Sequence, residues 1–144
     1  MPMLISTKNR SLIVDCIALL FILVFVYASL SKLGDYQKFL SQLGQSEILS
    51  AYSMQFSIVI PSFELLICAL LFFNRTKLLG LYGSFGIMVL FTLYIGSILV
   101  LTEDIPCACG GILEMLSWEA HIWFNMGLIV LAMIGVLLYR SDVF

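Results

Sequence analysis

Residues 78–101, LLGLYGSFGIMVLFTLYIGSILVL, contain no charged side chain. A helix needs roughly 20 apolar residues to cross the core of a lipid bilayer, and this stretch is long enough. It lacks the apolar/polar alternation that marks a membrane-spanning strand. A segment surrounded by lipid must also satisfy its own backbone hydrogen bonds, which an α-helix does. The stretch therefore predicts a transmembrane helix.

The rest of the chain has the same character. Hydrophobic residues make up 62% of its 144 residues and charged residues only 11%, too few to solvate a globular surface of this size. The mean hydropathy is +1.10. The predicted spans are residues 12–30, 54–73, 78–101 and 118–139. We predict an all-α membrane protein, in which residues 1–144 form a single four-span domain folded as an antiparallel four-helix transmembrane bundle.

Two local patterns add detail to this bundle. Between the first two spans, apolar residues recur at helical spacing with polar residues between them: Tyr36, Phe39, Leu40 and Leu43. This amphipathic pattern predicts a short helix in the membrane interface, which we interpret as a surface lid, with partner docking as the alternative. The third span carries small residues that allow close helix packing: Gly80, Gly83, Ser84 and Gly86.

The basic residues predict the orientation. Five of the seven Lys and Arg residues fall on one side of the predicted spans: Lys8, Arg10, Arg75, Lys77 and Arg140. By the positive-inside rule that side is cytoplasmic, so both termini are expected there. Lys32 and Lys38 fall on the opposite side. The net charge of −2 and the lack of a basic run argue against nucleic acid as a partner.

The first apolar stretch has an alternative interpretation. Lys8 and Arg10 precede an apolar run that reaches Val26-Tyr27-Ala28, which also fits a secretory signal peptide with its cleavage site. Cleavage there would leave the orientation of the remaining loops unchanged.

Two cysteines one residue apart, Cys107 and Cys109, lie in the predicted extracytoplasmic loop of residues 102–117. Disulfides persist on that side of the membrane. A Cys-x-Cys ring is tight, and strained disulfides exchange more readily. Gly110 and Gly111 permit the sharp backbone that closure needs. Because a bridge across one residue removes little chain entropy, thiol–disulfide exchange is better motivated than a structural staple.

Two alternatives to exchange stay open for this loop. The cysteines could form a static bridge in a non-catalytic membrane subunit that anchors or assembles a larger complex. Copper(I) or zinc could also be handled by soft or borderline ligands close in sequence, namely Cys107, Cys109, Met115 and His121. Their spacing is irregular, so no metal site is assigned.

His121 is the only histidine of the chain and lies near the outer end of the fourth span. Trp118, His121 and Asn125 fall on one helix face. A histidine near a cysteine pair can stabilise a thiolate and move its proton. It can equally bind a quinone carbonyl, or simply hydrogen-bond to a loop carbonyl.

Glu64 lies near the middle of the second span, three residues after Pro61. A carboxylate at that depth is costly, so it should face the bundle interior. We expect a polar clamp between helices, with a proton relay as the alternative. The partners expected from matching depth are Tyr27, Thr92 and Tyr94. Cys16 and Cys68 in the first two spans are expected to be small apolar fillers rather than a second exchanging pair.

Several short motifs resemble a known family. YASLSKLGDYQKFL (residues 27–40) and IPSFELLICALLF (residues 60–72) resemble the DoxX-like membrane proteins. CACGG (residues 107–111) and LSWEAHIWFN (residues 116–125) bring the resemblance closer to the redox-associated MauE branch. It extends over residues 12–139. The matching residues are Lys32, Gly34, Pro61 and Glu64 in the DoxX-like part and Cys107, Cys109, Gly110 and Gly111 in the redox-associated loop.

This resemblance implies a four-helix protein of the bacterial inner membrane. The MauE family is tied to methylamine utilisation and is thought to help form or move disulfides during maturation of periplasmic methylamine dehydrogenase. Thioredoxin-like or client proteins of the periplasm are the implied partners, and a thiol–disulfide oxidoreductase is the implied enzyme class. The bundle is also similar to those of DsbB and vitamin K epoxide reductase, which makes a quinone the candidate cofactor. Unlike those two, this chain has Cys-x-Cys in place of Cys-x-x-Cys and no second extramembrane pair.

Overall fold

The structure, a computed structural model, describes residues 6–45, 50–101 and 118–143. Its elements are α1 (Thr7–Gly34), α2 (Tyr36–Gln45), the short 3-10 helix η2 (Ser50–Tyr52), α3 (Ser53–Phe72), α4 (Lys77–Leu101) and α5 (Trp118–Val143). Within the described ranges there is no strand. Four helices are long and apolar enough to cross a membrane, in the segments Thr7–Gly34, Ser50–Phe72, Lys77–Ser97 and Ala120–Arg140. The predicted four-helix membrane fold is confirmed.

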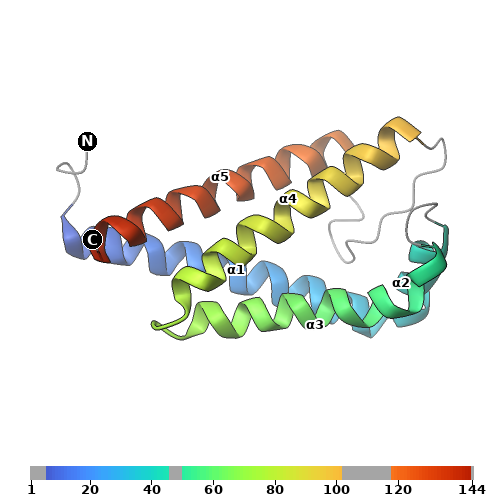
Figure 1. Cartoon of the computed structure of the whole chain (residues 1–144), viewed down its shortest axis with the longest axis horizontal. Helices are drawn as coiled ribbons and strands as arrows, with labels where there is room; N and C mark the ends of the chain where they lie inside the picture. Colours follow the sequence, from blue (N-terminus) through green and yellow to red (C-terminus); the bar gives the residue numbers. More distant parts are fainter. Residues whose placement is uncertain (1–5, 46–49, 102–117, 144) are drawn as a thin grey trace.

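The four long helices form an antiparallel bundle (Figure 1). Helix α1 packs on α3 and α5, and α4 packs on the same two helices, so α1 and α4 lie diagonally across the bundle. The start of α1, the α3–α4 turn and the end of α5 lie together, and we call this the hairpin end (Figure 1). The opposite end carries α2 and is called the α2 end.

Helix α1 is longer than the apolar stretch within it. It begins at Thr7, where the Ser6 hydroxyl oxygen accepts a hydrogen bond from the backbone N–H of Asn9 at 3.3 Å and caps the first turn. It continues to Gly34, beyond the predicted limit of residue 30, and Lys32 therefore lies in its last turn. Nothing in residues 31–33 breaks a helix, so the backbone continues to Gly34.

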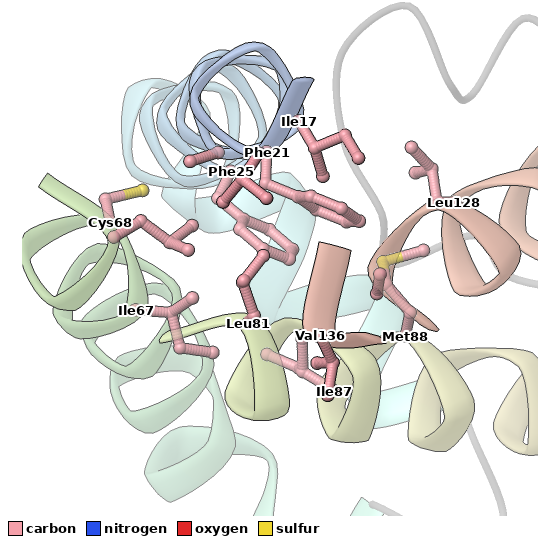
Figure 2. Packing of buried hydrophobic residues seen from close by; sticks show 14 residues of the cluster. Ile17, Phe21, Phe25, Ile67, Cys68, Leu81, Ile87, Met88, Leu128 and Val136 are labelled. Atoms are coloured by element: carbon pink, nitrogen blue, oxygen red, sulfur yellow. The ribbon is translucent and has the colours of Figure 1, made fainter. Parts of the chain in front are cut away.

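The interior is apolar and is built from all four long helices. Phe21 and Phe25 of α1 are fully buried with ring centroids 5.7 Å apart, and Leu81 of α4 packs among them (Figure 2). The outward faces are apolar as well, with large side chains such as Leu90 (65% exposed) and Leu137 (63% exposed). Helices that are hydrophobic on every face suit a surrounding of lipid rather than water.

Small residues bring α4 close to α3, as predicted, at two of the three glycines. A Cβ atom at Gly80 would lie 2.9 Å from the backbone N of Leu71, and one at Gly83 would lie 3.3 Å from Ile67 Cγ1. Ser84 is fully buried and donates its hydroxyl hydrogen to Gly80 O at 2.8 Å. Gly86 is different, because a Cβ there would meet nothing within 4 Å.

Polar contacts join three helices at the hairpin end. Lys77 Nζ lies 2.5 Å from the Asp15 carboxylate of α1 and donates to Asn74 Oδ1 at 2.9 Å. The hydroxyl of Tyr139, near the end of α5, donates to Asn74 O at 3.0 Å. These contacts fix the α3–α4 turn to both α1 and α5.

Helix α2 confirms the predicted short helix between spans one and two. It follows α1 after Asp35 and packs on α1 and α3. Of its predicted apolar face, Phe39 is 3% exposed, and Tyr36 and Leu40 are partly buried. The Leu43 side chain lies outside the described residues.

Candidate functional site

A buried ion pair joins α1 to α3 near the α2 end. Lys32 Nζ lies 2.6 Å from Glu64 Oε1, and the two side chains are 1% and 0% exposed. Ser29, one turn before Lys32 on the same helix face, donates to Glu64 Oε2 at 2.9 Å. Each carboxylate oxygen of Glu64 thus has its own donor from α1.

Two aromatic rings complete the surroundings of the lysine. Lys32 Nζ lies 5.8 Å from the ring centroid of Phe39 on α2 and 5.4 Å from that of Phe91 on α4. Both distances are within the range of cation–π attraction. The ammonium group is therefore in contact with side chains from α2, α3 and α4, while its own stem belongs to α1.

Further hydrogen bonds lie beside this cluster. The hydroxyls of Tyr36 on α2 and Ser57 on α3 are 2.8 Å apart, and Ser57 donates to Met54 O at 2.6 Å. Pro61 stands between Ser57 and Glu64 in α3, and its carbonyl lies 3.3 Å from the Ser29 hydroxyl. Since proline has no N–H, this turn of α3 lacks one helical hydrogen bond.

The structure places Glu64 in the interior, as the cost of its charge in lipid predicts. Its observed donors are Ser29 and Lys32, rather than the residues expected from depth. Thr92, one of those expected, donates instead to Met88 O at 2.8 Å. Depth along a span does not give the rotation of a helix, and that rotation decides which side chains meet.

Lys32 is the residue that sequence reasoning missed as a partner of Glu64. The positive-inside pattern assigns Lys32 to the outer basic residues, whereas the structure buries it, with only 2% of the residue exposed. A signal was present, because Ser29 and Lys32 share a face of α1 and the DoxX-like resemblance marks both Lys32 and Glu64. That resemblance does not state that the two side chains meet.

The predicted site residues of α5 are buried too. His121 is 1% exposed and Asn125 is 2% exposed, one helical turn apart. Within the described part of the chain, Asn125 Nδ2 has no hydrogen-bond acceptor. The side chain of Trp118 lies outside the described residues, as do all of Cys107, Cys109, Gly110, Gly111 and Met115.

The two described cysteines are separate thiols. Cys16 is exposed on α1, and Cys68 is buried on α3, where its sulfur lies 3.7 Å from Ile22 O. The interpretation as fillers fits Cys68. Nothing joins these sulfurs into a second exchanging pair.

The geometry thus shows a polar cluster of Ser29, Lys32 and Glu64 inside an apolar four-span bundle. A family model, methylamine utilisation protein MauE, matches residues 10–138. The chain belongs to the MauE family. The match begins in α1 at residue 10 and ends in α5 at residue 138, so it touches all four spans of this MauE-family protein and includes the segment that joins α4 to α5. Neither the curated proteins nor the solved structures yield a match.

Proposed function

We propose that this MauE-family protein carries out thiol–disulfide exchange for methylamine utilisation, through Cys107 and Cys109. The observation that carries the proposal is that the family match includes the cysteine pair together with both helices that flank it. A Cys-x-Cys pair within a matched membrane family supports exchange, because a disulfide closed across one residue is strained and exchanges readily.

The proposed reaction conserves atoms and electrons. A thiolate of the client attacks Cys109 Sγ in the Cys107–Cys109 disulfide, and Cys107 leaves as a thiolate. The second client thiolate then attacks the client sulfur of this mixed disulfide and releases Cys109. Two electrons pass from the client to the pair, and the two thiol protons end on Cys107 and Cys109. The disulfide of a thioredoxin-like partner re-oxidises the pair by the same exchange.

Supporting roles are assigned to residues around the pair. His121 takes or gives the proton of the attacked sulfur, in keeping with the usual role of histidine near neutral pH. Gly110 and Gly111 leave Cys109 open to an incoming thiol, and Trp118 and Asn125 hold the start of α5. Glu64 supports the bundle through its contacts with α1.

The proposed location is the cytoplasmic membrane of a bacterium. The hairpin end carries Lys8, Arg10, Arg75, Lys77 and Arg140 and would face the cytoplasm. Residues 102–117 join the helices at the α2 end, on the opposite, extracytoplasmic side. The partner is then a periplasmic thioredoxin-like or client protein, and residues 1–144 act as a single membrane domain.

Trapping tests the proposal. Cys107→Ser and Cys109→Ser should each abolish disulfide formation in methylamine dehydrogenase in cells, and one of them should accumulate a mixed disulfide with its partner. Cys16→Ser is the matched control, because Cys16 is exposed in the N-terminal half of α1, and it should change neither result. Unchanged client disulfides and no captured partner would instead favour a static bridge in an anchoring subunit.

A further inference from the structure

We propose that α2 is a hinged cover over the α2 end of the bundle, and that the charge of Glu64 keeps it closed by holding Lys32 inside. This proposal does not depend on thiol exchange. It rests on the described contacts of Lys32, Glu64 and Phe39.

The ammonium of Lys32 is the part of the cluster that is hardest to bury. A lysine charge in an apolar interior is costly unless it is paired. Here its pairing comes from Glu64 Oε1 at 2.6 Å, with the faces of Phe39 and Phe91 adding weaker attraction. Without the carboxylate charge, the two rings alone do not compensate for lost hydration.

Lys32 has a short way out of the bundle. It lies in the last turn of α1, three residues before Asp35, which is exposed. A lysine side chain so near a helix end can extend its charged group to the membrane surface. The Phe39 ring of α2 lies 5.8 Å from the ammonium, so we expect an outward movement of Lys32 to displace that ring.

Helix α2 depends on its packing against the bundle. It is a ten-residue helix, and an isolated helix of this length is marginal in water. It packs on α1 and α3 through the buried ring of Phe39, the partly buried Tyr36 and Leu40, and the 2.8 Å contact between the Tyr36 and Ser57 hydroxyls. Since the Phe39 ring is the most deeply buried of these side chains, its displacement by an outward movement of Lys32 should loosen α2.

The two members of the pair therefore differ in what their loss does. Glu64→Gln leaves Lys32 charged and unpaired, so the lysine should move outward and open α2. Lys32→Met removes the ammonium that lies against Phe39, so no charge is left to move outward past α2, while Ser29 still donates to Glu64 Oε2 and the methionine side chain fills the space between the two rings. If the ion pair only clamped α1 to α3, both substitutions should loosen α2 to a similar extent.

Hydrogen exchange of the α2 backbone amides, in detergent or nanodiscs, measures the opening. Glu64→Gln should speed exchange in α2 at least about tenfold relative to α5, while Lys32→Met should change it less than about threefold. The double variant Lys32→Met/Glu64→Gln should return to within about threefold of wild type, because it buries no charge. Lys77→Met, which breaks the ion pair at the hairpin end, should leave α2 unchanged.

Two results would overturn the proposal: equal acceleration in both single variants without recovery in the double variant, or no acceleration in Glu64→Gln. Glu64→Asp covers the case in which Glu64→Gln does not fold. Aspartate keeps the negative charge, but its side chain is one methylene shorter, so the carboxylate lies farther from Lys32. Hydrogen exchange in α2 should then fall between the rates of wild type and Glu64→Gln. Wild-type exchange in Glu64→Asp would then count against the proposal.

Discussion

At the scale of single residues, Glu64 shows how a carboxylate can lie inside an apolar bundle. Its two oxygens accept hydrogen bonds from Lys32 and Ser29, and the side chain has no exposed surface. A buried ion pair is a weak source of stability, because desolvation offsets most of the attraction. Breaking one is costly, since the remaining charge is left without compensation.

Ser29 provides a direct measure of this compensation. Ser29→Ala removes the donor to Glu64 Oε2 and should lower the free energy of unfolding by about 1–3 kcal/mol, the usual cost of leaving a buried polar group unsatisfied. Denaturant titration in detergent micelles measures the change. Ser62→Ala is the matched control on α3, because Ser62 is exposed and its hydroxyl donates only to Ile58 O of its own helix. An equal loss in both variants would contradict the role given to Ser29.

The burial of Glu64 could be predicted from the sequence, but its partner could not. Charge at mid-span depth is a local property, and it is enough to turn a side chain inward. The meeting of Glu64 with Lys32 depends on the rotation and relative height of α1 and α3. Those are properties of two helices together, and neither stretch of sequence contains them alone.

At the scale of elements, the α3–α4 pair depends on glycine at one point above all. Gly80→Ala would place a Cβ 2.9 Å from Leu71 N, and backbone cannot yield as a flexible side chain does. We expect a loss of about 1–3 kcal/mol in the free energy of unfolding. Gly86→Ala should be neutral or slightly stabilising, because nothing lies within 4 Å of the added carbon and alanine favours a helix. Thermal unfolding of the two variants in the same micelles compares them.

These glycines also mark a limit of sequence reasoning. Gly80 and Gly86 occur in one apolar stretch with similar neighbours, and both fit close packing. Only one lies against another helix, because positions six apart in a helix point in very different directions. The span itself was predictable, since hydropathy is read directly from the residues.

At the scale of the whole molecule, the bundle separates polar features into two ends. The Asp15–Lys77 pair and the Tyr139–Asn74 contact hold the hairpin end, and α2 occupies the other, with the Lys32–Glu64 pair between the last turn of α1 and the middle of α3. The proposed orientation assigns one end to each side of the membrane.

Labelling of introduced cysteines tests that orientation. In a background with the four native cysteines replaced by serine, Ser41→Cys on α2 should react with a membrane-impermeant maleimide in intact cells. Arg75→Cys, in the α3–α4 turn, should react only after the membrane is permeabilised. Both positions are exposed, so access to the reagent depends on the side of the membrane. The reverse pattern would place the α2 end in the cytoplasm.

The cysteine chemistry is predicted from residue type and spacing. The Cys-x-Cys spacing and the family resemblance both point to residues 107–111, which lie outside the described ranges. The sequence indicates the reactive atoms through residue type alone. The sequence does not give the surroundings of the two sulfurs, because these depend on contacts between segments that are far apart in the chain.

Gly135 of α5 has a consequence for how such proteins diversify. Its backbone lies where three helices meet, with a Cβ there falling 3.2 Å from Leu81 Cδ2 and 3.3 Å from Ile17 Cγ2. This crossing fixes the mutual alignment of α1, α4 and α5 in the C-terminal half of α5, away from its start at Trp118. A change in the segment that joins α4 to α5 should therefore leave the alignment of the helices intact. If the segment that joins α4 to α5 in one family member replaces that of another, the thiol reactivity should follow the segment while the helix packing stays the same.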